Sequence, residues 1–374
     1  MKLGFDAKRI THNATGLGNY GRIILSAFAE YYPTNEYFLY TPSPGNLNLR
    51  KQLLLTDSVS FHYPQRFQKI FPPLWRSYGI SSDLKKDNIN IFHGLSNELP
   101  FNIKRSGILS IVTIHDLIFL RYPKLYNPID RRIYTCKFKE ACLQADRIIA
   151  VSEQTKKDII SFFKIKENKI RVVYPGCNQL FYKQVTREEI NKIKEKYAIT
   201  QPYILYVGSI EERKNVLLAV KALSKIEKDV ILIAVGRRTH YMDTVEAYAK
   251  ENKLDERLRL LTNVPFEDLP ALYQSAALFV YPSFFEGFGI PIAEALASNT
   301  PVIAATGSCL EEVGGMGSLY TNPNNIDELA ELMNSVLNNQ HLADSMRHQG
   351  AKYVERFSAA NLSIELMSVY KEIL

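Results

Sequence analysis

The segment YPSFFEGFGIPIAEALA, residues 281–297, holds the densest group of residues that could do chemistry. Glu286 and Glu294 lie on the two sides of a glycine-containing turn, between an apolar run typical of a strand and an apolar helical pattern. Pro291 suits the first position of that helix. The turn would present three backbone N–H groups beside the helix N-terminus, those of Gly287, Phe288 and Gly289. The sequence therefore predicts that this turn binds an anion such as phosphate.

A second signal lies in YVGSIEERKNVLLAV, residues 206–220, where Arg213 and Lys214 follow a strand-like run and precede a helical one. A cation beside the positive end of a helix dipole is unfavourable unless it binds an anion. Arginine offers a planar fork and lysine a point charge, a pair suited to a diphosphate. Both signals have a structural alternative, in which the two cations are a solvated pair and the helix dipole merely stabilises Glu294.

The stretch TGLGNYG, residues 15–21, spells the G-x-G-x-x-G pattern of dinucleotide-binding domains with Gly16, Gly18 and Gly21. In those domains the first glycine directly follows a buried strand. Here the polar stretch KRITHNA separates it from the expected first strand, which ends near Asp6. The dinucleotide hypothesis is therefore disfavoured. We expect instead a flexible glycine loop that leads into the helix NYGRIILSAFAEYY and brings backbone N–H groups close to a ligand.

Strand-like and helical patterns alternate along the chain, which predicts β-α units and parallel sheets. The strand-like runs are KLGFDA, EYFLYT, VSFHY, INIFHG, LSIVTIHD, RIIAVS and IRVVYP in the first half, and YILYVGS, VILIAVG, LRLLTNV, AALFVYPS, TPVIAAT and GSLYTNP in the second. We predict an α/β protein of two doubly wound, Rossmann-like domains facing a central cleft, residues 1–178 and 190–357. Such sheets bind ligands at the ends of strands, where the charged motifs stand.

Composition is that of a soluble enzyme, with 46% hydrophobic and 23% charged residues. No apolar run approaches the roughly 18 residues of a membrane span. The four cysteines lack C-x-x-C spacing, so neither zinc nor disulfides are expected. The formal net charge is +7, but residues 1–180 carry 26 basic against 14 acidic side chains, whereas residues 181–374 carry 20 against 25. These features predict a cytoplasmic protein with a basic first half.

Taken together, the motifs resemble the retaining glycosyltransferases of the GT-B fold in family 4, the group 1 glycosyltransferases. The resemblance rests on RKN after VGS and on PSFFEGFGIPIAEALASNTPVIAATGSCLEEVGG, with Glu286 and Glu294 as its most distinctive pair. It extends to TGLGNYGRIILSAF, INIFHG, VTIHDL and IIAVSEQTKKDI, and hence to nearly the whole chain. It implies that the final helix, within residues 358–374, packs back on the first domain.

The resemblance also implies how a nucleotide-sugar donor is bound. Arg213 and Lys214 would neutralise the donor diphosphate, and Glu294 would bind the ribose hydroxyls. The donor sugar would be held by the first carboxylate and the turn after it, namely Glu286, Gly287, Phe288 and Gly289. Gly16 and Gly18 would approach the sugar or phosphate from the opposite domain. Backbone groups around LTNVPFEDL would hold the base.

His115, at the end of LSIVTIHD, matches a family histidine that lies beside the transferred sugar. The resemblance thus gives four expected catalytic residues, His115, Glu286, Arg213 and Lys214. Asp116 follows the histidine, and it either serves the site or caps the next segment.

The implied reaction moves a hexose from a nucleoside diphosphate sugar to an acceptor hydroxyl, with retention at the anomeric carbon. Mannose from GDP-mannose is favoured, because similar proteins include mannosyltransferases of bacterial surface-polysaccharide assembly; a UDP-sugar is the alternative. The sequence has no D-x-D metal clamp, and positive side chains with a helix dipole can replace a cation. We therefore expect neither a metal ion nor a cofactor.

The first half is expected to hold the acceptor, a glycan or a lipid-linked hydroxyl. YPQRFQKIFPPLWRSYG interleaves Phe67, Phe71, Trp75 and Tyr78 with Arg66, Lys69 and Arg76, and a later helix carries Arg131, Arg132, Lys137 and Lys139. Such patches favour peripheral contact with the anionic inner face of a membrane. The alternative places these aromatic rings in the core and the charges in water. No nucleic-acid-binding signature appears, so nucleic acid is not an expected partner.

Two other functions are compatible with parts of the pattern. A glycoside hydrolase or phosphorylase would use Glu286 and Glu294 as an acid/base pair, but both carboxylates would then flank the sugar bond. A non-catalytic nucleotide-sugar or glycan-binding protein on the same scaffold is disfavoured, because the set of charged residues is intact.

Overall fold

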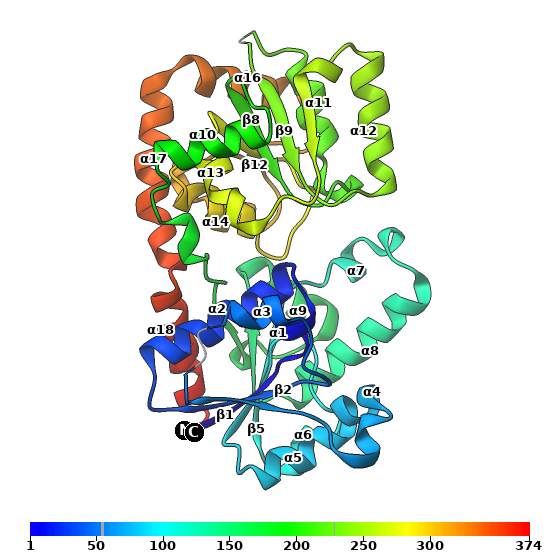
Figure 1. The fold of residues 1–374 in the computed structure, drawn as a ribbon. Helices are drawn as coiled ribbons and strands as arrows, with labels where there is room; N and C mark the ends of the chain where they lie inside the picture. Colours follow the sequence, from blue (N-terminus) through cyan, green and yellow to red (C-terminus); the bar gives the residue numbers. More distant parts are fainter. Residues whose placement is uncertain (54–55, 228) are drawn as a thin grey trace. The chain divides into compact units, whose positions relative to one another are not determined.

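The computed structural model describes residues 1–53, 56–227 and 229–374; the side chains of Arg66 and Phe67 also lie outside the described part. The chain divides into two compact units. Unit 1 consists of Met1–Gly176 and Ala359–Leu374, and unit 2 is Cys177–Ser358. Each unit is a doubly wound, Rossmann-like domain with one parallel sheet and helices packed around it (Figure 1).

Within the described residues, unit 1 contains a seven-stranded parallel sheet in the order β3-β2-β1-β4-β5-β6-β7. Its strands are β1 (Lys2–Asp6), β2 (Glu36–Tyr40), β3 (Val59–His62), β4 (Ile91–Gly94), β5 (Leu109–Ile114), β6 (Arg147–Ala150) and β7 (Ile170–Val172). The register pairs Leu3 of β1 with Tyr37 on one side and with Ile91 on the other. The direction of winding therefore reverses between β1 and β4.

Helices connect the strands of unit 1. They are α1 (Lys8–His12), α2 (Gly16–Tyr31), α3 (Leu47–Lys51), α4 (Pro72–Leu74), the π-helical turn η2 (Trp75–Gly79), α5 (Ile80–Lys86), α6 (Ile103–Ser106), α7 (Ile118–Arg121), α8 (Pro128–Gln144), α9 (Glu153–Phe163) and α18 (Ala359–Lys371). Short 3₁₀ turns lie at η1 (Arg66–Lys69), η3 (Pro123–Leu125) and η4 (Glu167–Lys169).

The described part of unit 2 contains a six-stranded parallel sheet in the order β10-β9-β8-β11-β12-β13, the 3-2-1-4-5-6 order of a Rossmann fold. Its strands are β8 (Tyr203–Val207), β9 (Ile231–Val235), β10 (Leu258–Leu261), β11 (Leu278–Tyr281), β12 (Val302–Ala305) and β13 (Leu319–Thr321). Its helices are α10 (Arg187–Lys196), α11 (Val216–Leu223), α12 (His240–Glu251), α13 (Leu269–Gln274), α14 (Ile290–Ala297), α15 (Leu310–Gly314), α16 (Ile326–Asn338) and α17 (Gln340–Val354). Its 3₁₀ turns are η5 (Gln179–Phe181), η6 (Glu212–Lys214), η7 (Asp255–Arg257), η8 (Phe266–Asp268), η9 (Gly315–Gly317) and η10 (Glu355–Phe357).

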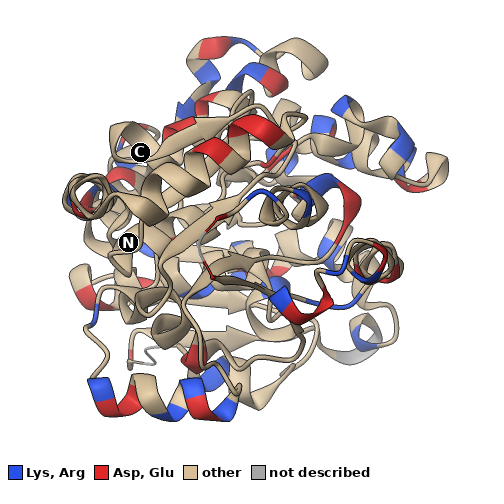
Figure 2. Cartoon of the chain, turned by 90° about the horizontal axis from the view of Figure 1, so that it is seen from above, with Lys and Arg blue, Asp and Glu red and all other residues tan. Residues whose placement is uncertain are grey.

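The inner strands are largely apolar because helices cover both faces of a doubly wound sheet, whereas β3 and β10 at the sheet edges are only partly buried. All five residues of β9, ILIAV, are buried. Charged residues lie mainly in the helices and loops around the strands (Figure 2). Charged residues that stand directly at strand ends are therefore candidates for a site.

The G-x-G-x-x-G stretch lies inside a helix, which corrects the expected glycine loop. α2 begins at Gly16 itself. A Cβ at Gly18 would lie 1.8 Å from the carbonyl oxygen of Asn13. A Cβ at Gly21 would lie 2.6 Å from Ile10 Cγ1. The second and third glycines therefore let α2 pack closely against α1 and the segment after it.

The C-terminal helix α18 is part of unit 1. Its apolar side chains join the core formed by β1 and α2; the shared cluster includes Leu362, Leu366, Met367, Val369 and Tyr370 together with Phe5, Ile24 and Phe28. The Tyr370 hydroxyl lies 2.6 Å from His93 Nδ1 of β4. The helix therefore covers the middle of the first sheet.

Candidate active site

The charged motifs of unit 2 lie where its strand order reverses. β8 and β11 are neighbours in the sheet and lead into loops at residues 208–215 and 282–289. Arg213 and Lys214 come from the first loop, and Glu286 comes from the second. In doubly wound sheets, the crevice outside the carboxyl ends of two such strands is the usual place for a ligand.

Glu286 is at the centre of this group and is 9% exposed. Its Oε1 accepts hydrogen bonds from Lys214 Nζ at 2.8 Å, from Ser283 Oγ at 2.8 Å and from the Tyr281 hydroxyl at 3.1 Å. Its Oε2 lies 3.1 Å from Arg213 Nη1. The carboxylate thus ties the loop after β11 to the loop after β8.

These contacts set the charge of Glu286. Burial by itself raises the pKa of the carboxyl group, but Lys214, Arg213 and the hydrogen bond from Ser283 reverse that effect and bring the pKa to about 2. Burial lowers the pKa of Arg213, but Glu286 and Glu211 outweigh it and raise that pKa overall. Both groups are therefore charged at neutral pH.

The two cations are already held by carboxylates of the protein. Arg213 Nη2 donates to Glu211 Oε1 at 2.7 Å, and Nη1 donates to the carbonyl oxygen of Phe285. With Glu286, two carboxylates balance two cations, so the cluster is neutral. A diphosphate that binds here has to compete with Glu286 and Glu211 for the cations.

Packing shapes the glycine turn after Glu286. Gly289 is the N-cap residue of α14 and has φ +110°, a backbone conformation that side chains rarely adopt. A Cβ there would also lie 2.8 Å from Leu310 Cδ2. The thiol of Cys309 donates to the carbonyl oxygens of Glu286 and Phe288, at 3.1 and 3.0 Å. The turn is therefore fixed at the start of α14, and anion binding by it stays a prediction.

Glu294 lies on α14 in a very different electrostatic environment. It is 7% exposed and accepts a hydrogen bond from the Tyr273 hydroxyl at 3.0 Å. Burial raises its pKa to about 7, and the hydrogen bond offsets part of that shift. Near neutral pH the carboxyl group is therefore present in both protonation states, and it can exchange hydrogen bonds with hydroxyl groups as donor or acceptor.

Replacement of Glu294 by glutamine is expected to stabilise the ligand-free protein, and more at pH 8 than at pH 5. A carboxyl group with a raised folded-state pKa favours folding at low pH, and this stabilisation is lost as pH rises from 4.5 to about 7. The expected gain at pH 8 is about 1–3 kcal/mol. Thermal unfolding at both pH values measures it, with Glu331→Gln on the exposed side of α16 as the control. Equal shifts at the two pH values would contradict the raised pKa.

His115 follows β5 in unit 1 and is neutral. Burial lowers the pKa of its imidazole to about 4. Nε2 donates to the Leu95 carbonyl oxygen at 2.8 Å, and the backbone N–H donates to Asn97 Oδ1 at 2.7 Å. The ring packs edge-on against Tyr20, with centroids 4.7 Å apart. Nδ1 is then the acceptor nitrogen, and because it makes no hydrogen bond to the described residues, it can accept one from a hydroxyl.

Unit 1 also contains the other residues predicted for the site, Asp116, Gly16 and Gly18. Asp116 Oδ1 accepts a hydrogen bond from the Ile118 N–H at 3.1 Å, but the N-cap residue of α7 is Leu117, so a role of Asp116 in the site stays a prediction. Gly16 and Gly18 form the first turn of α2, and a Cβ placed on Gly16 would meet no described atom within 4 Å beyond its chain neighbours and its own helix backbone. The approach of these glycines and of His115 to a donor held by unit 2 stays a prediction.

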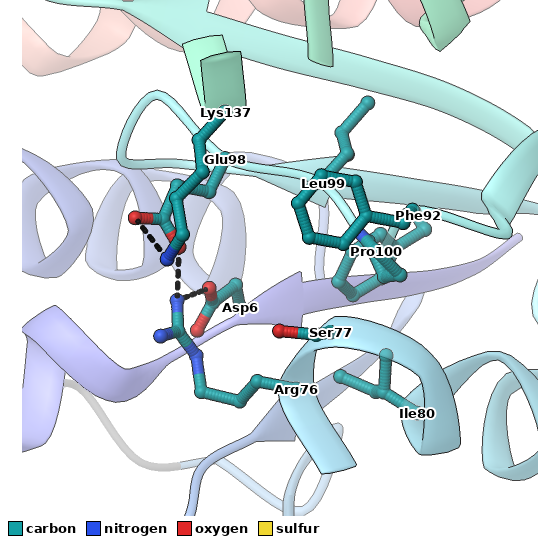
Figure 3. A pocket seen from close by; sticks show the side chains of 10 residues that line it. Asp6, Arg76, Ser77, Ile80, Phe92, Glu98, Leu99, Pro100 and Lys137 are labelled. Carbon is teal, nitrogen blue, oxygen red and sulfur yellow. Dashed lines mark hydrogen bonds and ion pairs between the residues drawn. The ribbon is translucent and has the colours of Figure 1, made fainter. Parts of the chain in front are cut away.

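The aromatic and basic stretch before α5 divides between core and surface. Trp75 is 2% exposed and donates from Nε1 to Asp83 Oδ2 at 2.7 Å. Arg76 lies 2.5 Å from Asp6 Oδ2. The expectation that both residues face a membrane is therefore wrong, because the Trp75 ring is buried and the Arg76 side chain is only 15% exposed and engaged with Asp6 (Figure 3). Lys69, Phe71 and Tyr78 are exposed.

Sequence reasoning missed the residues that complete the Glu286 cluster. Glu211 stands two residues before Arg213, and Ser283 stands three residues before Glu286. Each of these two residues is a polar side chain shortly before a predicted site residue, and that position was the signal from which both could have been identified. Tyr281 belongs to an apolar strand, where a tyrosine is typical of the core, so no pattern marked it as a site residue.

Within the described ranges, no helix is both long and apolar enough to cross a bilayer. Among the same residues, no three His, Cys, Asp or Glu side chains gather as they would around a metal ion. Metal independence stays a prediction.

Two doubly wound parallel units, with cations and carboxylates at a reversal of strand order, define a two-domain α/β protein of Rossmann-like architecture. The family model described as Glycosyl transferases group 1 matches residues 188–353. The model described as Glycosyltransferase Family 4 matches residues 27–179. The chain belongs to the family 4, group 1 glycosyltransferases, which confirms the family and the fold predicted from the motifs.

Individual proteins agree with this assignment. The chain is 28% identical to O-antigen chain mannosyltransferase B of Escherichia coli over 397 residues, 99% of this chain and 100% of that one. It is 30% identical to O-antigen chain mannosyltransferase RfbU of Salmonella typhimurium over 251 residues, 67% of this chain and 66% of that one. The crystal structure of Anabaena HepE in complex with UDP and glucose shares the fold, with a TM-score of 0.77, 16% identity and 100% of both chains covered.

Proposed function

We propose that this glycosyltransferase moves a hexose, with mannose favoured, from a nucleoside diphosphate sugar to a hydroxyl of a glycan or lipid-linked acceptor in surface-polysaccharide synthesis. The transfer retains the anomeric configuration and needs no metal ion. Two relatives named as O-antigen chain mannosyltransferases support mannose. The UDP and glucose of the Anabaena structure keep a UDP-sugar as the alternative donor.

The observation that carries the proposal is the Arg213, Lys214 and Glu286 cluster at the strand-order reversal of unit 2. Departure of a diphosphate places negative charge on a phosphate oxygen. Two fixed cations and the N-terminus of α14 stabilise that charge without reorganisation of solvent. Cationic side chains thereby supply the positive charge that a bound cation would supply elsewhere.

Glu286 of this cluster and His115 of unit 1 provide groups for the sugar. The Glu286 carboxylate accepts hydrogen bonds from hydroxyls of the donor sugar, and the neutral His115 accepts one at Nδ1. The bond between the anomeric carbon and the diphosphate oxygen breaks, while the acceptor oxygen forms its bond on the same face. The acceptor proton passes to the leaving phosphate oxygen, so no protein base is required for this step. Glu294 holds the ribose hydroxyls.

The stereochemistry can be tested without knowing the acceptor. Purified protein is incubated with GDP-mannose or UDP-glucose, and slow donor hydrolysis is followed by proton NMR. The first free sugar is expected to have the anomeric configuration of the donor, at a rate that EDTA leaves unchanged. Opposite configuration, or inhibition by EDTA, would overturn the corresponding part of the proposal. Release of sugar from a nitrophenyl glycoside without any nucleotide would point to a hydrolase instead.

Contact with an anionic membrane belongs to the same proposal and involves two stretches of unit 1. Exposed apolar side chains occur before and within α4 and η2 and along α8, namely Ile70, Phe71, Leu74, Tyr78, Ile129 and Ile133. Exposed basic residues accompany them, namely Lys69, Arg132 and Lys139. Both stretches contact the loop after β4, through Tyr78 with Phe101 and through Gln144 with the Phe101 carbonyl oxygen. Exposed apolar side chains together with basic residues fit an anionic lipid surface.

Flotation with lipid vesicles tests this contact. Phosphatidylglycerol vesicles are expected to bind the protein and phosphatidylcholine vesicles are not. The double variant Phe71→Ser, Leu74→Ser is expected to lose binding, whereas Leu47→Ser, at an exposed leucine of α3, is expected to keep it. Equal binding to both vesicle types, or by the double variant, would speak against a membrane-facing surface here.

A further inference from the structure

A network of four buried polar side chains runs through the core of unit 1 toward His115. It begins at Tyr370 of α18, whose hydroxyl lies 2.6 Å from His93 Nδ1 of β4. His93 Nε2 lies 2.8 Å from the Thr113 hydroxyl of β5. That hydroxyl lies 3.1 Å from the hydroxyl of Tyr20 on α2. This polar network therefore joins two helices and two strands that are far apart in the sequence.

The polar network ends against the ring of His115. Tyr20 meets this imidazole edge-on, with the ring planes at 87° and the centroids 4.7 Å apart. The Leu95 carbonyl oxygen holds Nε2 of the same imidazole at 2.8 Å. The hydrogen bond thus fixes one point of the ring, and the Tyr20 ring restricts rotation about that point. Tyr20 therefore helps to decide where Nδ1, the acceptor nitrogen of His115, is directed.

Stability alone gives little reason for polar groups at this place. Tyr20 and Tyr370 share one apolar core cluster with Phe5 and Leu95. Burial lowers the pKa of His93 to about 3, so its imidazole is neutral and contributes no ion pair. Replacement of both partners of a buried hydrogen bond by apolar groups of the same shape can be nearly neutral or stabilising. A satisfied buried network, however, fixes the positions of the groups that it joins.

His93 transmits the constraint from Tyr370 to Thr113. A neutral imidazole donates from one nitrogen and accepts at the other. The role that Nδ1 takes toward Tyr370 therefore sets the role that Nε2 takes toward Thr113. Hydrogen bonds in such a series also polarise and strengthen one another. Loss of the contact at α18 is therefore expected to change the contact at Tyr20.

We propose that Tyr370 and His93 are positioning residues for His115, so that the C-terminal helix α18 helps to direct the histidine nitrogen that faces the donor sugar. The inference rests on the proposed function, because the sugar contact of His115 belongs to it. α18 lies beside α2, the helix that carries Tyr20, and both helices pack into one core (Figure 1). Side-chain packing and the polar network thus couple the same two helices.

Two phenylalanine variants cut the polar network at its ends and keep both rings. Tyr370→Phe and Tyr20→Phe are each expected to lower kcat for hydrolysis of GDP-mannose or UDP-glucose about fivefold, the effect of about one hydrogen bond. The donor KM is expected to stay unchanged, because unit 2 is expected to hold the nucleotide. Since both substitutions interrupt one network, the double variant is expected to be about as slow as either single variant.

Tyr37→Phe is the matched control. Tyr37 is a buried tyrosine of the same core, and its hydroxyl donates to the carbonyl oxygens of Phe28 and Tyr32, outside the polar network. This variant is expected to unfold at a lower temperature and to keep the natural kcat. A loss of kcat equal to that of Tyr370→Phe, or independent losses that multiply in the double variant, would overturn the inference.

The imidazole signals of protein labelled with ¹⁵N-histidine give a second readout that needs no turnover. His115→Asn identifies the His115 signals by their loss. Tyr370→Phe is expected to shift these signals, although the hydroxyl that it removes contacts His93, whereas Tyr37→Phe is expected to leave them in place. Unshifted His115 signals in a folded Tyr370→Phe protein would overturn the inference. If the natural protein hydrolysed no donor, the proposed function would fail, and the NMR signals would still decide whether α18 positions His115.

Discussion

The variant Glu286→Gln is expected to bind a free nucleoside diphosphate more tightly than the natural protein while losing sugar transfer. Glu286 engages Lys214 at 2.8 Å and Arg213 at 3.1 Å, so it competes with phosphate for both cations. The glutamine keeps the shape but not the charge, and we expect the dissociation constant of GDP or UDP to fall about tenfold. Transfer is expected to fall at least about 100-fold, because the sugar loses its anionic hydrogen-bond acceptor.

Isothermal titration with GDP and UDP, alongside donor turnover, separates these two effects. Glu256→Gln, at an exposed glutamate of η7, is the control for loss of one negative charge from unit 2. If Glu286→Gln bound the diphosphate no more tightly, the carboxylate would not be the competitor of the phosphate. If transfer persisted at the natural rate, Glu286 would not serve the donor sugar.

The same substitution is expected to change the acid sensitivity of the fold. The pKa of Glu286 lies at about 2 in the folded protein against 4.5 for an unperturbed carboxyl group. A lowered pKa stabilises the folded state above 4.5, and this contribution, up to about 3 kcal/mol, is lost as pH falls toward 2. The variant should therefore be less stable than the natural protein at neutral pH. It should also lose less stability than the natural protein as pH falls from 4.5 toward 2.

The variant Arg213→Ala is expected to lose both nucleotide binding and transfer. The guanidinium bonds to Glu286 and to the Phe285 carbonyl oxygen, so it is one of the links between the loops after β8 and β11, and it also pairs with Glu211. It also supplies one of the two positive charges for the diphosphate. Removal of such a preorganised charge is expected to lower transfer by about 10³-fold. The thermal stabilisation that GDP or UDP gives the natural protein should disappear.

Two further variants separate loss of function from loss of folding. Arg213→Lys keeps the charge and removes the fork, so it should recover part of the nucleotide stabilisation. Arg238→Ala, at an exposed arginine that pairs with Asp243 and Glu246, controls for loss of a surface cation in unit 2. A folded Arg213→Ala protein that GDP or UDP still stabilises as fully as before would remove this residue from the donor site.

The neutral cluster in unit 2 has a consequence for the catalytic cycle. Because Glu286 and Glu211 already pair with the cations, donor binding exchanges ion pairs within the protein for ion pairs with phosphate. The net gain in electrostatic energy is smaller than two unpaired cations would give, since the protein pairs are lost or shared. Product release is favoured for the same reason, because Glu286 re-forms its contacts as the diphosphate leaves.

Local patterns in the sequence determined the architecture. Parallel strands buried on both faces require continuous apolar runs, and those runs alternate with helical periodicity in both halves of the chain. The positions of Arg213, Lys214, Glu286 and Glu294 next to such runs also indicated the donor site, because ligands bind at strand ends. These inferences depend on near neighbours in the chain, which the sequence displays directly.

The tertiary structure alone decided how these residues are charged and paired. Glu286 and Glu294 stand in one short segment, yet one pKa falls to about 2 and the other rises to about 7. The difference arises because Lys214, 72 residues away, reaches only the first of them. Likewise, Arg76 meets Asp6 across 70 residues because η2 packs at the carboxyl end of β1. Electrostatic partners far apart in the chain follow strand order and packing, which local periodicity does not encode.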